Sequence, residues 1–372
     1  MSFEKKLFCA ACAAAILVGC TPDDGSAELE KARAARAAGD LKGAEISYAA
    51  SIEKCQTNFE AHLERALVNL ELGEPAVAMK AATTACELDP ASAEARLVAA
   101  SAAYQGRDYA TAARLYTSIA DDKELPADVR SQALSSRAVL ELAENSFDLA
   151  RLSLVRAMRL DRRNYAAWYH LGYLSRDTYR FSAAALEQFE MCSRLMPPGD
   201  PRAQKIVRDV IPALRDAVAH LAASRPGVAT RDPNGAAKLI AEGEALLKKG
   251  HKKEAKEKFV KAYKTDPLSY PAAWNAARLL AETETTSAGV DRALAAFRAA
   301  IDAKPSSRNT YLTAARYALK NRQPRTAVKI LSRAFAHDPE SPQVVELYAA
   351  ALIQAGEAKT AALYQAYRKE LP

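Results

Sequence analysis

The stretch from Tyr165 to Pro197 constrains the fold most, because large and small residues follow one another in it at helical spacing. Its landmarks, in order, are Trp168, Leu171, Gly172, Ala185, Phe189, Cys192 and Pro197. Trp168 and Leu171 are one helical turn apart and share a face. The small residues let two antiparallel helices approach closely, and Phe189 fills the space toward the next pair. The pattern predicts a helical hairpin that ends at Pro197.

The same pattern returns along the chain with a period of about 34 residues. Three copies fit without a gap, and they are residues 59–92, 236–269 and 308–341. Five looser copies share the small and aromatic positions, and they are residues 25–58, 93–122, 131–164, 271–307 and 342–372. With the stretch that ends at Pro197, the sequence predicts nine consecutive hairpins.

The recurring pattern resembles the tetratricopeptide repeat (TPR), whose signature is W-x2-L-G, then A-x3-F, then a closing Pro. The resemblance implies an all-α fold, an α-solenoid in which antiparallel helix pairs stack into a right-handed superhelix. A generic Ala-rich helical bundle is the alternative. Such a bundle would not repeat Ala-x3-aromatic and Asp-Pro in register, so the solenoid is the better prediction.

Breaks in the pattern divide the solenoid into two arrays joined by a hinge. Residues 27–197 form an array of about five repeats, and 236–372 form one of about four. Between them, residues 198–223 carry a helical apolar stripe and are predicted to cap the first array. Residues 224–235 are rich in Pro, Gly and Asn, which predicts a linker.

The N-terminus has the features of an export signal. Residues 1–19 have two basic residues near their start, Lys5 and Lys6. An apolar run follows that is too short to span a bilayer. The run ends in Leu17-Val18-Gly19-Cys20, which resembles a bacterial lipobox. The resemblance implies cleavage before Cys20 and lipid attachment to its thiol, with residues 20–26 as a lipidated tether and Ser26 as the N-cap of the first helix. The alternative is an ordinary secretory signal that contains a Cys.

A lipid anchor at Cys20 implies a protein of the cell envelope, an outer-membrane lipoprotein that faces the periplasm. Asp23 and Asp24 leave surface exposure open. The cysteines that follow Cys20 are Cys55, Cys86 and Cys192. They are an odd number, and they do not have the spacing of metal ligands. Cys86 and Cys192 fall at small apolar helix positions, which predicts buried thiols, although pairing of Cys55 with Cys86 stays open.

No motif in the sequence predicts catalysis. The five histidines do not pair at metal-ligand spacing, and no HExxH, GxxxxGK[ST], GxSxG or GxGxxG pattern occurs. The acidic residues alternate with Lys and Arg along helices, as solvated faces do. We therefore expect a protein that is not an enzyme and that has no catalytic residue, cofactor or metal.

The TPR resemblance implies a concave groove lined by the first helix of each repeat. The predicted binding residues of this groove are Tyr104, Tyr169, His170, Tyr173 and Arg176. Aromatic and Arg side chains supply large contact areas at modest entropic cost, which suits peptide recognition. The alternative is that the tyrosines only fill space between neighbouring repeats and bind no ligand.

A second candidate is a basic surface in the Lys-rich run from residue 248 to 264. Lys252, Lys256 and Lys258 represent it, and Glu254 is placed to pair with Lys258 along the helix. A solvated helix face is the simpler interpretation. The more specific interpretation is that the lysines attract anionic headgroups or an acidic partner, which the net charge of +7 permits. Nucleic acid is not expected as the partner of an exported protein.

Three functions remain open at this point. The first is a lipid-anchored scaffold that binds extended peptides or envelope proteins in its groove. The second is a specialised form, an assembly lipoprotein for pili, secretion pores or outer-membrane barrels. The third is a carbohydrate-binding or enzyme-associated factor of the cell wall or exopolysaccharide. The sequence does not select the partner or the oligomeric state.

Overall fold

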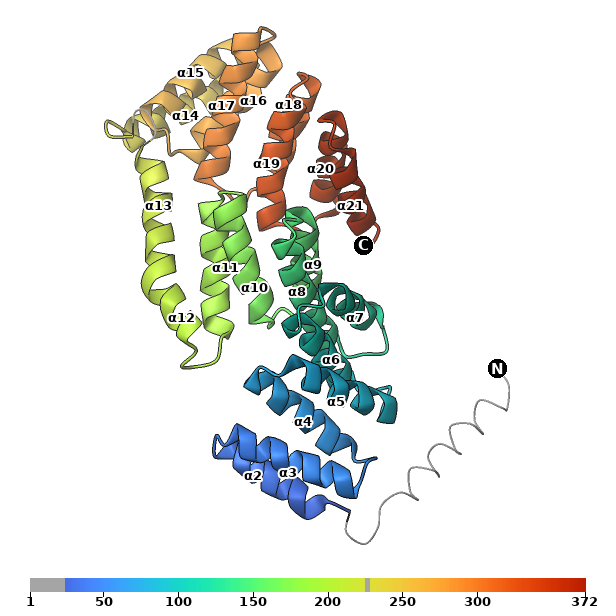
Figure 1. Ribbon diagram of the computed structural model, residues 1–372. Coiled ribbons are helices and arrows are strands. Elements are labelled where there is room, and N and C mark those ends of the chain that lie inside the picture. Colours follow the sequence, from blue (N-terminus) through green and yellow to red (C-terminus); the bar gives the residue numbers. More distant parts are fainter. Residues whose placement is uncertain (1–23, 225–227) are drawn as a thin grey trace. The chain divides into compact units, whose positions relative to one another are not determined.

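A computed structural model describes residues 24–224 and 228–372 (Figure 1). Every regular element in these residues is helical, and nine helix pairs follow one another along the chain. The predicted all-α solenoid of helical hairpins is confirmed. The predicted signal peptide, the predicted lipidation site Cys20 and the first part of the predicted tether lie outside the described residues.

The described chain forms two compact units, which divide within helix α9. The first unit contains residues 24–146 and 156–164 of the described chain, and the second contains 147–155 and those from 165 onward. The helices up to this division are α2 (Ser26–Ala37), α3 (Leu41–Lys54), α4 (Phe59–Leu72), α5 (Pro75–Leu88), α6 (Ala93–Gln105), α7 (Tyr109–Asp121), α8 (Ala127–Ala143) and α9 (Phe147–Leu160).

The second unit contains repeats five to nine and the long helix between the fifth and the sixth. Its helices are α10 (Tyr165–Tyr173), the π-helical turn η1 (Leu174–Thr178), α11 (Ser182–Leu195), α12 (Pro201–Lys205), η2 (Ile206–Val210), α13 (Ile211–Ala223), α14 (Pro233–Lys248), α15 (Lys252–Thr265), α16 (Tyr270–Thr283), α17 (Ser287–Ala303), α18 (Arg308–Lys320), α19 (Pro324–His337), α20 (Pro342–Gln354) and α21 (Ala358–Arg368). The predicted linker at residues 224–235 lies within this unit, so it is a different feature from the division at α9.

Short polar residues start many of the helices. Asp40, Asn58, Ser92 and Asp108 each accept a hydrogen bond from the backbone N–H three residues on, at 2.9–3.2 Å. These bonds satisfy donors that the first helical turn leaves without a partner. The expected N-cap at Ser26 is wrong by one residue, because Gly25 occupies the cap position and Ser26 is already helical.

The turn inside each hairpin has a left-handed residue at the same place in eight of the nine described repeats. These residues are Gly39, Gly73, Arg107, Asn145, Arg180, Gly250, Arg322 and Gly356, with φ between 57° and 86°. Such a residue ends the first helix and reverses the chain. The seventh repeat lacks it, although its turn from Glu284 to Thr286 is as long as most of the others.

The small residues of the repeat pattern allow the two helices of a hairpin to pack closely. A Cβ atom added to Gly172 would lie 2.9 Å from ring atoms of Phe189, and one added to Gly243 would lie 2.9 Å from Phe259. These separations are too short for a real side chain. The Gly and the aromatic residue of the signature are therefore a matched pair, as predicted from their spacing.

The long helix from α12 to α13 packs on α11. Ile206, Val210 and Leu214 are buried there in one cluster with Phe189 and Cys192. The π-helical turn η2 lies directly before Pro212, which has no N–H to continue the regular hydrogen bonding. The helix thereby covers apolar surface that α11 would otherwise expose.

A buried polar cluster joins distant parts of the second unit, and we call it the Arg151 clasp. Its members are Asp148, Arg151, Tyr179, Ser332, Phe335 and Tyr364. The Arg151 guanidinium lies 4.4 Å from the ring centroid of Tyr179 and 4.6 Å from that of Phe335. It donates to the carbonyl oxygen of Ser332 at 2.7 Å and to its hydroxyl at 3.1 Å.

Asp148 completes the clasp one helical turn before Arg151. Its Oδ1 atom accepts hydrogen bonds from the hydroxyls of Tyr179, at 3.0 Å, and Tyr364, at 2.8 Å. The clasp therefore ties the start of α9 to the turn of the fifth repeat and to α19 and α21, the last of which lies 216 residues away in sequence. Within this unit, the C-terminal repeats fold back onto α9.

Candidate binding site

Four of the predicted groove residues form one cluster on α10 and η1. The rings of Tyr169 and Tyr173 are 4.8 Å apart, and His170 stands edge-on to Tyr169 at 5.2 Å. The guanidinium carbon of Arg176 lies 4.6 Å from the Tyr173 ring centroid. Arg176 also pairs with Asp177 at 2.6 Å, so its charge is already compensated.

Neighbouring elements occupy much of this α10 cluster. Tyr173 packs edge-on against Phe189 at 4.9 Å. Arg202 of α12 lies 6.0 Å from the Tyr169 ring. Both tyrosines are partly buried against the core that includes the α12–α13 helix. This part of the predicted groove is therefore largely in contact with the protein itself.

Burial also decides the charge of two groups near α10. It lowers the pKa of His170 to about 4, and the nearby Arg202 cation adds to the effect. Burial raises the pKa of the Cys192 thiol to about 12. At neutral pH the histidine is uncharged and the thiol is protonated, so neither acts as an ionic contact or a nucleophile.

The other predicted groove residue, Tyr104, lies at the end of α6 in the first unit. Its side chain is exposed and packs with Tyr109 at 5.8 Å between ring centroids. The α10 cluster belongs to the second unit. That Tyr104 and the α10 cluster act on one ligand stays a prediction.

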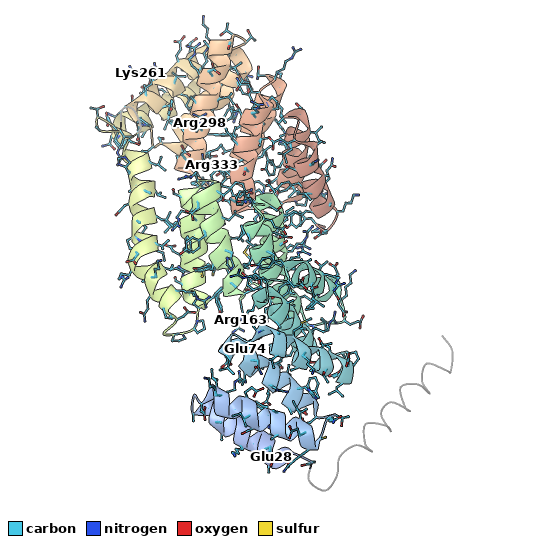
Figure 2. All side chains as sticks on the ribbon, viewed as in Figure 1. Glu28, Glu74, Arg163, Lys261, Arg298 and Arg333 are labelled. Carbon is cyan, nitrogen blue, oxygen red and sulfur yellow. The ribbon has the colours of Figure 1, made fainter. Side chains whose placement is uncertain are left out.

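The predicted basic surface consists of lysines that have partners within the protein. Lys252 pairs with Glu282 at 3.0 Å, and Lys256 pairs with Glu284 at 3.0 Å. The sequence suggested that Lys258 pairs with Glu254 on its own helix. In the structure Lys258 pairs instead with Glu242 of α14, at 2.6 Å. The carboxylates of α14 and α16 thus neutralise much of this charge. Lys261, labelled in Figure 2, extends from α15.

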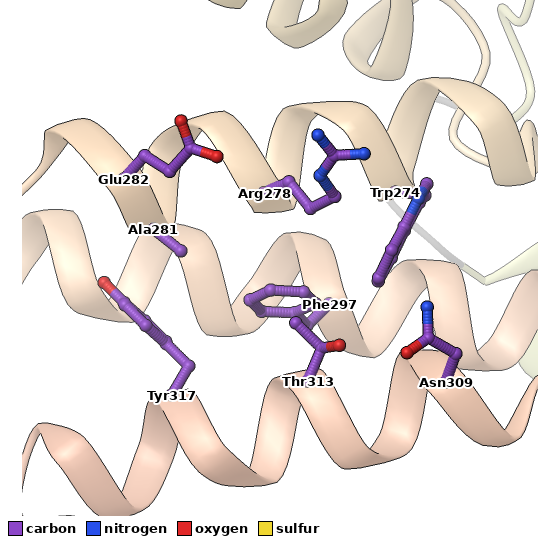
Figure 3. Close-up of a pocket in the computed structure, with 8 residues that line it drawn as sticks. All are labelled: Trp274, Arg278, Ala281, Glu282, Phe297, Asn309, Thr313 and Tyr317. Carbon is purple, nitrogen blue, oxygen red and sulfur yellow. The ribbon is translucent and has the colours of Figure 1, made fainter.

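A pocket of about 400 Å³ opens between α16 and α18 in the second unit (Figure 3). Its lining residues are Trp274, Arg278, Ala281, Glu282, Phe297, Asn309, Thr313 and Tyr317. α16 and α18 are the first helices of the seventh and eighth repeats, and Phe297 reaches the pocket from α17 between them. The pocket therefore lies between equivalent helices of two neighbouring repeats.

Aromatic rings form a continuous wall in this pocket. Trp274 meets Phe297 at 6.1 Å between ring centroids, and Phe297 meets Tyr317 at 5.9 Å. Tyr270 lies parallel to Trp274, at 6.4 Å with 8° between the ring planes, and supports it. These separations are within the range of favourable aromatic pairs. The rings therefore support one another through direct contacts.

The pocket also has polar side chains, which differ in whether they have a partner within the protein. Glu282 is engaged by Lys252, whereas the Arg278 guanidinium stands 5.9 Å from the Trp274 ring at the rim. The Tyr317 hydroxyl is buried and has no hydrogen-bond partner in the described structure. Burial raises the pKa of Tyr317, so the hydroxyl stays protonated at neutral pH.

The repeat pattern does not predict this pocket, although one signal in the sequence could have revealed it. Arg278 stands four residues after Trp274, at the place where Gly172 follows Trp168. A large cation at the small position of the repeat signature indicates that this hairpin is used differently. The long second helix of the same repeat, α17 with 17 residues, is a second departure.

Cys86 and Cys192 are free thiols, so the Cys55–Cys86 disulfide that the sequence left open does not form. Cys192 is fully buried as predicted, and Cys86 is partly buried. No group of three or more metal-binding side chains gathers in residues 24–224 or 228–372. None of the helices described there has both the length and the apolar character needed to cross a bilayer.

Stacked helical hairpins with an open pocket between equivalent helices define a helical-repeat interaction protein. The family model for the tetratricopeptide repeat matches residues 63–128, 240–308 and 312–372, which is more than half of the chain. The chain belongs to the tetratricopeptide repeat family. Proteins of this family serve as scaffolds that bind peptides or partner proteins.

Several solved structures are similar to this chain at low identity. MamA from Desulfovibrio magneticus RS-1 is 15% identical, with 48% of this chain and 98% of that chain covered and a TM-score of 0.40. PilF from Pseudomonas aeruginosa is 16% identical, with 55% and 94% covered and a TM-score of 0.42. A tetratricopeptide repeat protein from Parabacteroides merdae is 13% identical, with 88% and 99% covered and a TM-score of 0.36. A comparison with curated proteins finds no match.

Proposed function

We propose that this protein is a non-enzymatic scaffold, anchored by lipid at Cys20 in the bacterial cell envelope, that holds an extended segment of a partner protein in the pocket between α16 and α18. The observation that carries the proposal is the pocket itself, which is open, has aromatic side chains in its wall and has a cation at its rim. Preformed concave sites with a few polar groups are typical of ligand binding.

This pocket is a better candidate than the two sites that the sequence favoured. The tyrosines of α10 already contact Phe189 and Arg202, and Lys252, Lys256 and Lys258 are engaged in ion pairs. A partner would have to displace these contacts before binding. The pocket of about 400 Å³ needs no such displacement.

The anchor rests on the Leu17-Val18-Gly19-Cys20 motif. Helix α2 begins at Ser26, only six residues after Cys20. Six residues reach at most about 20 Å, at roughly 3.5 Å per residue. A lipid at Cys20 would therefore hold the first repeat near the membrane surface, most simply the periplasmic face of the outer membrane.

One observation favours a second candidate function, the binding of carbohydrate from the cell wall or exopolysaccharide. Trp274 presents an aromatic ring beside the amide of Asn309 and the hydroxyl of Thr313, and such groups can stack on and hydrogen-bond a sugar. A specialised role in assembling pili, secretion pores or outer-membrane barrels is a narrower form of the scaffold proposal.

The anchor predicts the behaviour of Cys20→Ala. Because one thiol carries the lipid, we expect the variant to remain uncleaved or to leave the membrane fraction, and to incorporate no fatty-acid analogue. The measurement is fractionation of cells after a high-salt wash, with metabolic labelling. Cys86→Ala is the matched control and should behave as the wild type. A wild-type protein that takes up no lipid label would remove the anchor from the proposal.

The scaffold role is tested by a photo-cross-linking residue in place of Thr313 in the full chain. We expect it to form adducts with a small number of envelope proteins in cells, since Thr313 lines the pocket. Trp274→Ala should abolish these adducts, because truncation of an aromatic hot spot typically costs about 2 kcal/mol or more. A cross-linker at the exposed Arg298 is the control. Adducts that persist in Trp274→Ala would contradict a binding role for the pocket.

A further inference from the structure

The sixth repeat has a lysine-rich outer surface that is separate from the pocket. It consists of the outward side of α15 and the turn before this helix, and we call it the lysine face. Its members are Lys248, Lys249, Lys253, Lys261 and Lys264. We propose that the lysine face binds the anionic headgroups of a lipid bilayer. This contact goes beyond the scaffold function, belongs to the second unit and does not require a lipid at Cys20.

The two parts of the described chain differ strongly in charge. Residues 24–146 contain 13 basic and 20 acidic side chains, whereas residues 147–372 contain 37 basic and 23 acidic ones. The net charge of the whole chain conceals this division, because the two parts partly cancel. A strong asymmetry of this kind is typical of proteins that contact nucleic acid or a membrane. The basic part is therefore the place to expect contact with an anionic surface.

Within the basic part, residues 248–264 differ from the rest in the kind of cation. They contain eight lysines and no arginine, while the remainder of residues 147–372 contains 22 arginines and seven lysines. An arginine guanidinium makes planar, bidentate contacts, whereas a lysine ammonium is a strongly hydrated point charge on a flexible stem. Lysines therefore suit a partner whose charges move, as headgroups do in a fluid bilayer.

The structure separates the eight lysines into two groups. The three that represented the run in the sequence, Lys252, Lys256 and Lys258, are held in ion pairs with glutamates of α14 and α16. The five lysines of the lysine face are exposed, and none of them has an ion pair within the described part of the chain. The surface available to a partner is therefore a different set of lysines from the one that the sequence suggested.

The positions of the five lysines place them along one hairpin. At 3.6 residues per turn and 1.5 Å per residue, Lys253, Lys261 and Lys264 fall within a sector of about 80° and a length of about 16 Å on α15. Lys248 and Lys249 lie at the end of α14, in the turn that leads to the Lys253 end of α15. Lys261 marks this surface in Figure 2.

Neighbouring carboxylates do not cancel the charge of the hairpin. Residues 233–265 contain nine lysines and four glutamates. Glu282 and Glu284 of α16 also pair with the hairpin, and an excess of three lysines remains. On α15 itself, Glu254 bonds to His251 at 3.0 Å, and Glu257 lies one turn after Lys253. The hairpin is thus net positive with every nearby glutamate counted.

The lysine face lacks the features of a protein-binding surface. None of the exposed large hydrophobic side chains of the described chain lies between residues 248 and 264. Protein interfaces are enriched in aromatic side chains and arginine and depleted in lysine. Clusters of about four to eight basic residues on a helix are typical of surfaces that bind anionic lipids. Charge and composition together favour a bilayer over an acidic protein.

The test measures how the full chain sediments with lipid vesicles. Every sample carries Cys20→Ala, so no acyl chain contributes, and any contribution of residues 1–19 is common to all variants. The vesicles are phosphatidylcholine alone, or phosphatidylcholine with about one third phosphatidylglycerol. Each basic residue near an anionic bilayer strengthens binding about fivefold, so we expect binding to the anionic vesicles to be about tenfold tighter or more. This preference should disappear between about 0.1 M and about 1 M NaCl, because the Debye length falls from about 10 Å to about 3 Å.

Two matched variants locate the contact. The lysine-face variant combines Lys248→Gln, Lys249→Gln, Lys253→Gln, Lys261→Gln and Lys264→Gln, and it should lose the preference for anionic vesicles. The control combines Lys205→Gln, Lys320→Gln, Lys329→Gln, Lys359→Gln and Lys369→Gln, which are exposed lysines of the same unit outside the run. It removes the same net charge and should bind as the parent chain does. Unchanged circular dichroism shows that both variants are folded.

Each outcome bears on the proposal. Loss of the preference in the lysine-face variant alone supports it. Equal binding of the parent chain to both kinds of vesicle, or equal weakening in the two variants, overturns it. Binding to polyglutamate that needs the five lysines, without binding to anionic vesicles, overturns it in favour of an acidic protein. None of the substituted lysines lines the pocket, so cross-linking at Thr313 should persist in both variants and tests the scaffold function separately.

Discussion

Replacing Arg151 with alanine is expected to lower the free energy of unfolding of the second unit by about 3–5 kcal/mol, the range found when one partner of a buried ionic cluster is removed. Arg151 is 2% exposed and lies between the rings of Tyr179 and Phe335. Desolvated contacts between a cation and an aromatic ring contribute about 2 kcal/mol. The variant loses two of them and leaves a cavity.

The same substitution also leaves polar groups without partners. The carbonyl and hydroxyl of Ser332 lose the donors that they have in Arg151. A buried group left unsatisfied costs about 1–3 kcal/mol. These losses act together because they belong to one cluster, so they are not expected to add in full.

Hydrogen exchange measured by mass spectrometry locates the effect. In Arg151→Ala we expect faster exchange in α9, α19 and α21, which the clasp joins, and unchanged exchange in α2 to α5. Arg151→Lys keeps the charge but loses the planar guanidinium that stacks between rings. Its exchange rates in α9, α19 and α21 should therefore lie between those of the wild type and those of Arg151→Ala. The exposed Arg298→Ala is the control. Equal stability of Arg151→Ala and Arg298→Ala would show that the clasp contributes nothing.

The second large effect is a loss of stability in mild acid that depends on His170. Burial, together with Arg202, holds the pKa of His170 at about 4, while an unfolded histidine titrates near 6.5. Between these values the unfolded chain binds more protons than the folded one. Stability is therefore fully present above about pH 6.5 and falls as the pH drops toward 4. At about 1.4 kcal/mol per pKa unit, the loss is at most about 3 kcal/mol.

Urea unfolding at pH 7 and at pH 4.5 checks this expectation. Acidic residues titrate in the same range, so the informative quantity is the difference between wild type and His170→Gln, which cannot gain a proton. We expect the wild type to lose more stability than the variant. His220→Gln, at an exposed histidine on α13, should follow the wild type. Identical pH dependence in all three proteins would mean that His170 is hydrated and free to titrate.

Much of the fold could be predicted because the repeat signature is local. Gly172 and Phe189 are 17 residues apart in one hairpin, and their close packing follows from their sizes. The left-handed residues at Gly39, Gly73 and Arg107 recur every 34 residues and place the turns. Eight of the nine described hairpins have a left-handed turn residue of their own, so this signal does not depend on distant parts of the chain.

The candidate site was harder to predict, because exposure depends on neighbours that the signature does not encode. Tyr169 and Tyr173 occupy groove positions by their spacing, but Arg202 and Phe189 contact them in the folded chain. Lys258 is well placed to pair along its own helix, yet it pairs with Glu242 on the neighbouring helix.

The sequence by itself determined the helical hairpins, their order and the family, since these follow from contacts within about 34 residues. Only the tertiary structure decided that Arg151 meets Ser332, 181 residues away, and that a pocket opens between α16 and α18. The physical reason is that a buried cation or an open pocket depends on groups brought together from several helices. A repeat signature specifies how one hairpin packs, and it carries no information on which distant side chains will surround a particular residue.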